Sequence, residues 1–312
     1  MSLRLPVAAA AIASLLALAP PASASERAPE DTLHVFVTGA GPAVVVIPGL
    51  AGGAFAFRNV VPLLRESGCT VIVIEPLGVG ASGRPRRGDY SLSAQTDRIA
   101  DALDTLHVRD AVVVGHARGA SIAMRLAYRR PELVRAILSI EGGAAEAAAG
   151  PALRRAMRWA RLIKLFGTGN GLRKRIRDQM IESSGNPAWV RDEVVEGYAA
   201  PAVADFKRTI DVLAGMAKSR EPDSLRPHLG SIPCCVELLV GDAPHLGAID
   251  SEQIETLRQQ LRCFSLSHVP GTGHFIQEER PEAILAEVTR LARFTHEERT
   301  ARQTSADALP GK

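Results

Sequence analysis

Short apolar runs alternate along the chain with longer stretches of helical periodicity. Seven runs are rich in apolar residues, and two of them, 43–47 and 111–114, contain no polar residue, as expected for strands covered on both faces. The predicted strands are 33–37, 43–47, 70–75, 111–114, 136–140, 236–240 and 264–269. The predicted helices between them are 55–67, 91–107, 120–129, 252–261 and 281–294. This alternation predicts an α/β fold with a mostly parallel sheet and helices on both faces.

The alternation stops between Gly142 and Ile232, where the chain is rich in Arg, Ala and Leu and resembles a series of helices. Two turn-forming segments, 167–171 and 183–187, punctuate this stretch. We therefore predict a core formed by residues 31–141 and 232–296, interrupted by a helical insertion at 142–231. The polar tail at 297–312 is predicted to be disordered.

The first residues have the pattern of a secretory signal peptide. Arg4 precedes a short apolar run at 7–19, and Ala22-Ser23-Ala24 supplies the small residues that a signal peptidase needs. The run is too short to span a bilayer, which takes about 20 apolar residues. The chain is thus predicted to be exported, to the periplasm or outside the cell, after cleavage of residues 1–24 near Ala24. An uncleaved anchor or a misassigned start is the alternative.

Export would permit disulfides between the four cysteines, which are Cys69, Cys234, Cys235 and Cys263. Cys234 and Cys235 precede one predicted strand and Cys263 precedes the next, so a bridge between the two strand starts is one hypothesis. Buried free thiols are the other. No spacing of Cys and His indicates a metal site, and no cofactor is predicted.

Net charge and composition limit the classes of partner that the chain is expected to bind. The formal net charge is +3 and aromatic residues make up 4% of the chain. A surface of stacked bases and basic groups, as nucleic-acid binding requires, is not expected from these values. The oligomeric state is left open.

The segment Gly115-His116-Ala117-Arg118-Gly119 lies between a predicted strand and a predicted helix. This is the setting of the nucleophile elbow, Gly-x-Ser-x-Gly, with Ala117 in place of the serine. Such a turn is tight, and the two glycines avoid clashes between the strand and helix backbones. An ordinary glycine-rich turn is the alternative interpretation for this motif taken alone.

Three further segments follow predicted strands: 47–53, 75–82 and 271–275. With these motifs in this order, the sequence resembles the α/β-hydrolase family, in particular its cap-bearing esterases, lipases, epoxide hydrolases and haloalkane dehalogenases. The resemblance covers about residues 35–294. It implies an eight-stranded type of sheet and a helical lid inserted after the sixth strand, where residues 142–231 would form the lid.

The resemblance also implies site residues. His274 matches the general base, and the backbone N–H groups of Leu50 and Arg118 match the oxyanion pocket. The acid that orients the base is Glu141, which we favour, or Asp242, because the usual position holds Pro244. The side chain of Arg118 is expected on the surface, and the alternative is that it turns inward and adds charge to the pocket.

Ala117 is the main departure from the family pattern, and we take it as the native residue. A serine hydrolase needs an oxygen at this position, and dehalogenases or epoxide hydrolases need a carboxylate; a methyl group supplies neither. Ser82 and Ser121 are the nearest candidate replacement hydroxyls, and His116 is interpreted as structural.

The insertion carries a strongly basic stretch. Its cations include Arg154, Arg155, Arg158, Arg161 and Lys164, and apolar residues are interleaved with them. A basic amphipathic helix can bind an anionic membrane surface, and the alternative is a solvated outer face.

Three functions remain open at this point. The first is a non-catalytic or atypical relative that binds a small apolar or acyl-like ligand under its lid. The second is an enzyme that uses His274 with Glu141 or Asp242 for proton transfer or water activation. The third is a module that binds a partner or a membrane surface through the basic lid.

Overall fold

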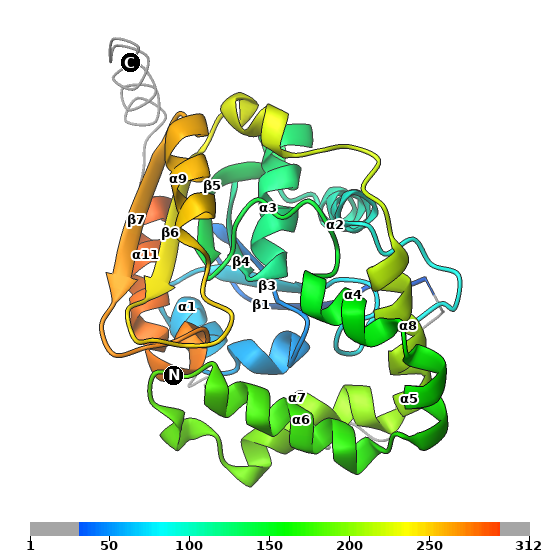
Figure 1. The fold of residues 1–312 in the computed structure, drawn as a ribbon. Coiled ribbons are helices and arrows are strands. Elements are labelled where there is room, and N and C mark those ends of the chain that lie inside the picture. The colour runs from blue at the N-terminus through cyan, green and yellow to red at the C-terminus, as the bar shows by residue number, and fades with distance from the viewer. Residues whose placement is uncertain (1–30, 294–312) are drawn as a thin grey trace, which may run out of the picture.

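A seven-stranded sheet forms the centre of the protein (Figure 1). The computed structural model describes residues 31–293, so the predicted signal peptide and tail lie outside the described residues. The strand order is β1-β3-β2-β4-β5-β6-β7, and β1 alone runs antiparallel to its neighbour. The strands are β1 (His34–Gly39), β2 (Ala43–Ile47), β3 (Thr70–Glu75), β4 (Ala111–His116), β5 (Val134–Ile140), β6 (Cys235–Gly241) and β7 (Phe264–Val269). The predicted parallel sheet is confirmed.

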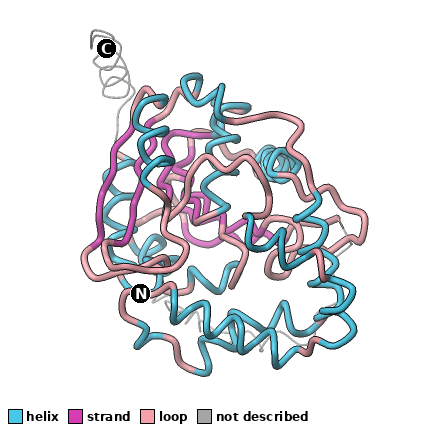
Figure 2. Tube along the Cα trace, in the orientation of Figure 1, coloured by secondary structure: helices cyan, strands magenta, loops and turns pink. Residues whose placement is uncertain are grey.

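Helices cover both faces of the sheet. Successive residues of a strand point to opposite faces, so each strand contributes side chains to two cores. Val45 and Ile47 of β2 belong to one core with α2 (Leu92–Thr105), α3 (Arg118–Arg129) and α9 (Ser251–Gln260). Val44 and Val46 belong to the other core with α1 (Val60–Glu66) and α11 (Pro281–Ala292). Figure 2 shows the strands enclosed between these helices. The predicted helix 55–67 is divided, because the 3-10 turn Gly53–Phe57 precedes α1.

The stretch between β5 and β6 is helical, as predicted. It contains α4 (Pro151–Met157), α5 (Ala160–Phe166), α6 (Gly169–Glu182), α7 (Asp192–Ala204) and α8 (Phe206–Lys218). The insertion follows the fifth of the seven described strands, and the sequence likewise placed five apolar runs before residue 142. In Figure 1 the arrowheads of β6 and β7 point toward the side of the molecule where α6 lies. The carboxyl edge of the sheet therefore faces the insertion.

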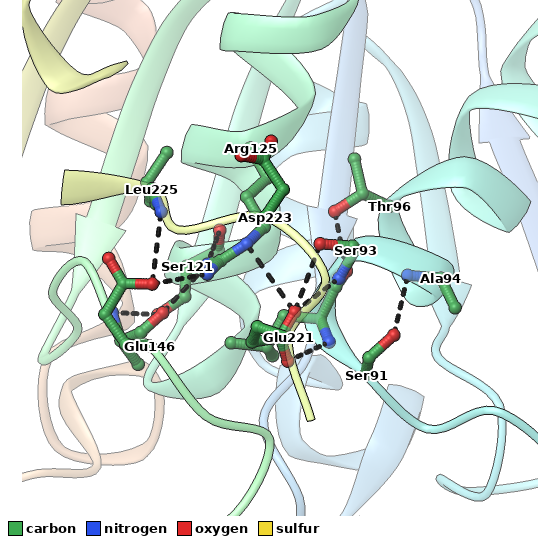
Figure 3. A network of polar contacts seen from close by, with 12 residues as sticks. Ser91, Ser93, Ala94, Thr96, Ser121, Arg125, Glu146, Glu221, Asp223 and Leu225 are labelled. Carbon is green, nitrogen blue, oxygen red and sulfur yellow. Dashed lines mark hydrogen bonds and ion pairs between the residues drawn. The ribbon is translucent and has the colours of Figure 1, made fainter. Parts of the chain in front are cut away.

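A buried polar network anchors both ends of the insertion to the core (Figure 3). The Arg125 guanidinium of α3 donates to the carbonyl oxygen of Ala145 over 2.8 Å and to the Glu146 carboxylate over 3.2 Å. It also lies 4.0 Å from the Glu221 carboxylate. Glu221 in turn accepts the backbone N–H of Leu92 at the start of α2, over 2.6 Å. One cation thus connects the chain before α4 with the chain after α8.

The sequence left the cysteine pairing open, and the structure resolves it. Cys235 and Cys263 form a disulfide, with their Cα atoms 4.6 Å apart. The bridge joins the starts of β6 and β7, as one of the two hypotheses predicted. Cys69 and Cys234 are buried thiols. Among the helices of residues 31–293, none is long and apolar enough to cross a membrane.

Candidate functional site

The tight turn at Ala117 follows β4 and leads directly into α3. Ala117 has φ 49° and ψ −113°, which is a strained conformation for a residue with a side chain. Its neighbours must be small, since a Cβ on Gly115 would lie 2.6 Å from the Cα of Ala120, and one on Gly119 would lie 2.1 Å from the carbonyl oxygen of Ile47. The geometry of a nucleophile elbow is therefore present, with a methyl group at its tip.

Glu75 connects the two loops beside this turn, a role that sequence reasoning missed. Its carboxylate accepts the backbone N–H of Ala54 over 2.6 Å and that of Ala81 over 2.7 Å. The loop after β2 is thereby held against the loop after β3. Leu50, the predicted oxyanion donor, lies in the first of these loops with 40% of its surface exposed. The only sequence signal for this role was an acidic residue at the end of an apolar run.

Arg118 turns inward, contrary to the predicted surface position. Its Nη1 lies 3.0 Å from the sulfur of Met216 on α8, which is a weak acceptor. Its Nε and Nη2 are buried, and neither has a hydrogen-bond partner within residues 31–293. Burial lowers the pKa of Arg118 to about 10, so the guanidinium remains charged at neutral pH. A buried cation without a carboxylate is costly, and the arrangement favours an anion beside it.

A cavity of about 180 Å³ lies between the core and the insertion. Leu50 of the loop after β2 and Gly78 of the loop after β3 form part of its wall, and residues of α6, α7 and α8 form much of the rest. Arg84 also lines it. A Cβ added to Gly78 would lie 3.2 Å from the terminal methyl of Met216, the residue that contacts Arg118. Met216 therefore lies close to both the cavity wall at Gly78 and the guanidinium of Arg118, which does not itself line the cavity.

His274 lies in the loop after β7. Its backbone N–H donates to the carbonyl oxygen of Ser183 over 2.8 Å, and its own carbonyl oxygen lies 3.0 Å from Nε2 of His116. Burial holds the pKa of His274 well below the usual value, with smaller effects from His116 and His245. Burial likewise lowers the pKa of His116 to about 4. Both rings are neutral at pH 7, and His274 is in the form that accepts a proton.

The two predicted acids occupy different environments. Glu141 is buried after β5, and its Oε1 accepts the N–H of Gly241 over 2.6 Å. Burial raises the pKa of Glu141. Asp242 is exposed, and its carboxylate accepts the N–H of Gly271 over 2.6 Å. In the part of the chain that is described, neither acid is hydrogen-bonded to His274.

The side chain nearest to Glu141 is one that sequence reasoning missed. His245 follows β6, and its Nε2 lies 3.4 Å from Oε2 of Glu141. One donor atom from each of Glu141, His245 and His274 lies within 4.8 Å of the other two. His245 is one residue beyond Pro244, where the family pattern suggested an acid, and no motif singled it out.

The two candidate replacement hydroxyls are both engaged in backbone hydrogen bonds. Ser82 donates to the carbonyl oxygen of Glu75 over 2.7 Å and accepts the N–H of His34 over 2.8 Å. Ser121 donates to the carbonyl oxygen of Gly143 over 2.5 Å and accepts the N–H of Ala145 over 3.1 Å. These contacts give each serine a structural role.

The basic stretch of the insertion is partly neutralised. Lys164 forms an ion pair of 2.6 Å with Asp211 on α8, so it does not contribute a free charge to the surface. Three of the four cations of α6 also meet acids, since Arg173 pairs with Glu196, Lys174 with Asp178 and Arg177 with Asp192. Four exposed arginines on α4, α5 and the turn between them have no such partner among the described residues, and they are Arg154, Arg155, Arg158 and Arg161.

Comparison with known proteins identifies relatives of this chain. The model of the alpha/beta hydrolase family matches residues 44–288. An uncharacterized hydrolase of Bacillus subtilis, YugF, is 24% identical over 77% of this chain and 86% of its own length. A 2-hydroxymuconate semialdehyde hydrolase of Pseudomonas is 32% identical over 57% of this chain and 64% of its own. An uncharacterized Mycobacterium tuberculosis protein is 34% identical, but the match spans only 31% of its length.

Solved structures share the fold. An epoxide hydrolase, CorEH, superposes with a TM-score of 0.68 at 18% identity, covering 83% of this chain and 94% of its own. A serine-to-alanine mutant of the meta-cleavage product hydrolase of Pseudomonas fluorescens, complexed with acetates, has a TM-score of 0.67 at 19% identity. That match covers 83% of this chain and 93% of the other.

Proposed function

Because the chain belongs to the alpha/beta hydrolase family, we propose that it is an exported member that binds a small apolar carboxylate beneath residues 142–231 without forming an acyl intermediate. The observation that carries this proposal is the buried, unpaired guanidinium of Arg118 next to Ala117. The helices α4–α8 act in it as the lid.

The absence of a reactive side chain at the turn argues against covalent chemistry. Acyl transfer by a serine hydrolase needs a side-chain hydroxyl that a base can deprotonate. The side chain of Ala117 is a methyl group and has no such oxygen. Ser82 and Ser121 are held by backbone hydrogen bonds.

The charge and the size of the site indicate the ligand class. A guanidinium forms two parallel charge-assisted hydrogen bonds to a carboxylate, which would satisfy the free Nε and Nη2 of Arg118. The nearby cavity, which Arg118 does not itself line, has a mainly apolar lining and a volume of about 180 Å³. A cavity of about 150 Å³ is large enough for benzene, so a small ring or a short acyl chain fits.

Replacing Arg118 with methionine tests the proposal. We expect Arg118→Met to weaken the binding of hexanoate by about 10- to 150-fold, because hydrogen bonds to charged groups contribute about 1.5–3 kcal/mol. The ligand-free variant should also melt at a higher temperature than the wild type, since it no longer buries an unpaired charge. Isothermal titration calorimetry and a thermal melt measure the two effects.

The controls separate recognition of the carboxylate from general effects on the fold. Arg129→Met removes a guanidinium from the last turn of the same helix, where Arg129 pairs with Asp97, and it should leave hexanoate binding unchanged. Hexanamide, which has the same chain without the charge, should bind the wild type and Arg118→Met equally. If Arg118→Met binds hexanoate as tightly as the wild type, the proposed recognition by Arg118 is wrong.

Binding to an anionic membrane surface is a second candidate function, supported by one patch on α4 and α5. Trp159, Leu162, Leu165 and Phe166 are all exposed there, and Phe166 has 76% of its surface accessible. Leu162 and Phe166 lie four residues apart on α5 and share one of its sides, and Trp159 immediately precedes that helix. The four unpaired arginines flank these apolar side chains. Apolar residues bordered by cations are typical of helices that lie in a membrane interface.

We expect Arg158→Gln/Arg161→Gln to weaken binding to vesicles that contain phosphatidylserine by about 30-fold, since each cation near an anionic surface contributes about 1 kcal/mol. Co-sedimentation over a range of salt concentrations measures this. The matched control is Arg258→Gln/Arg262→Gln, which removes the same charge from α9 and the loop after it. Equal binding by the two double variants, or binding that is insensitive to salt, would exclude this function.

A further inference from the structure

The geometry points to a divalent-metal site of the zinc class formed by Glu141, His245 and His274. These residues follow β5, β6 and β7, which are neighbouring parallel strands, so their side chains meet at one edge of the sheet. One donor atom from each lies within 4.8 Å of the other two. A zinc ion with bonds of about 2.1 Å would place tetrahedral ligand atoms about 3.4 Å apart, which requires only small side-chain rotations.

Each of the three side chains carries one buried nitrogen or oxygen atom that lacks a hydrogen bond. Oε2 of Glu141, Nε2 of His245 and Nδ1 of His274 are buried, and none of them forms a hydrogen bond within residues 31–293. A buried polar atom without a partner is unfavourable, and each of these three neighbouring side chains carries one. A cation between these side chains would satisfy all three atoms together.

The remaining atoms of the same side chains are oriented as in known metal sites. Nδ1 of His245 lies 2.7 Å from the carbonyl oxygen of Ala243, and a carbonyl can only accept, so Nδ1 carries the hydrogen. In the neutral ring Nε2 then presents a lone pair, 3.4 Å from the carboxylate oxygen of Glu141. The other oxygen of Glu141 accepts the N–H of Gly241. A metal-binding histidine usually donates its second N–H to a backbone carbonyl or carboxylate in this way.

The backbone of Glu141 supports the same interpretation. Its φ is 48°, in the left-handed region that a residue with a side chain adopts only at some cost. Strain of this kind persists where the surrounding structure fixes a side chain in one direction, and it is common at functional sites. Here it accompanies a carboxylate directed at two imidazoles.

The donor set selects the type of metal. Two imidazole nitrogens and one carboxylate oxygen suit Zn²⁺ and related first-row ions, whereas Ca²⁺ and Mg²⁺ prefer oxygen ligands alone. Three protein ligands leave a coordination position open for a water molecule or another small ligand. The site involves neither Arg118 nor the lining of the cavity. The test of metal binding is therefore independent of the test of carboxylate binding.

Zinc titration of the chelator-treated, dialysed protein tests the inference. We expect one Zn²⁺ per chain by elemental analysis and a rise in melting temperature on zinc addition. Co²⁺ should give the visible absorption of a low-coordinate nitrogen–oxygen site. His245→Gln and Glu141→Gln should each weaken zinc binding by more than about 100-fold, which is the upper end of what loss of an outer-sphere partner costs.

Three further variants make the result decisive. His245→Cys keeps a zinc ligand at this position and should retain binding, which separates loss of a ligand from loss of the fold. Asp242→Asn removes an exposed acid from the same loop, and His228→Gln removes a histidine that lies beside Asp223 elsewhere. Both should bind zinc like the wild type. A wild type that binds no Zn²⁺, or zinc binding that survives both His245→Gln and Glu141→Gln, would overturn the inference.

Discussion

Ala117→Ser is expected to raise the hydrolysis of short-chain esters about 100-fold above the wild type. The elbow already holds residue 117 in the strained conformation that presents a nucleophile, with φ 49°. Burial keeps the pKa of His274 low, so a neutral base is available at pH 7. A complete triad raises the rate by a factor of about 10⁶, and loss of its acid lowers the rate by a factor of about 10⁴. In this protein neither Glu141 nor Asp242 is hydrogen-bonded to His274. A serine and a base without their acid should therefore accelerate ester hydrolysis by about 10².

The measurement is initial-rate hydrolysis of p-nitrophenyl acetate, carried out in chelator so that metal does not occupy His274. Ala117→Ser/His274→Ala should return to the wild-type rate, whereas Ala117→Ser/Asp242→Asn should keep the gain because Asp242 is exposed and bonded to Gly271. Mass spectrometry should find an acyl adduct only when serine is present at residue 117. A wild type that hydrolyses the ester and loses this activity in His274→Ala would show that another group replaces the missing nucleophile.

The fold was largely predictable because its signals are local. Each of the seven described strands overlaps a predicted apolar run, since strands covered on both faces exclude polar residues over several positions in sequence. The glycines at 115 and 119 marked the turn, because backbone contacts around it leave no room for a Cβ. The five apolar runs before residue 142 match the five described strands before the insertion. The sixth-strand position came from the general pattern of the family and not from residues of this chain.

The candidate site was predictable in position but not in contacts. The sequence placed His274, Glu141 and Arg118 at strand ends, where parallel topology brings loops together. It did not show that Arg118 turns inward, because that depends on Met216, which lies 98 residues further along the chain. It also did not show His245, which meets Glu141 only after β5 and β6 pair. Such contacts depend on tertiary structure, and a single sequence carries no periodic signal for them.

Arg125→Ala should lower the free energy of unfolding by about 3–5 kcal/mol, the cost of removing one partner from a buried ion pair. The side chain of Arg125 is 2% exposed and that of Glu221 is 5% exposed. The variant would leave Glu221 as a buried charge without its cation. It would also remove the donor to Ala145 at the start of the insertion. Since 1 kcal/mol corresponds to about 2–4 °C in a protein of this size, the melting temperature should fall by roughly 10 °C.

The matched control is Arg130→Ala, five residues further along the chain. Arg130 forms two hydrogen bonds to Asp104, but both side chains are about one third exposed, and a pair of this kind contributes about 0–1 kcal/mol. Arg125→Met/Glu221→Gln should recover part of the lost stability, because it removes both charges and leaves no isolated ion. If Arg125→Ala and Arg130→Ala reduce the melting temperature equally, the network around Arg125 does not anchor the insertion. The insertion would then be held to the core mainly by apolar packing of its helices.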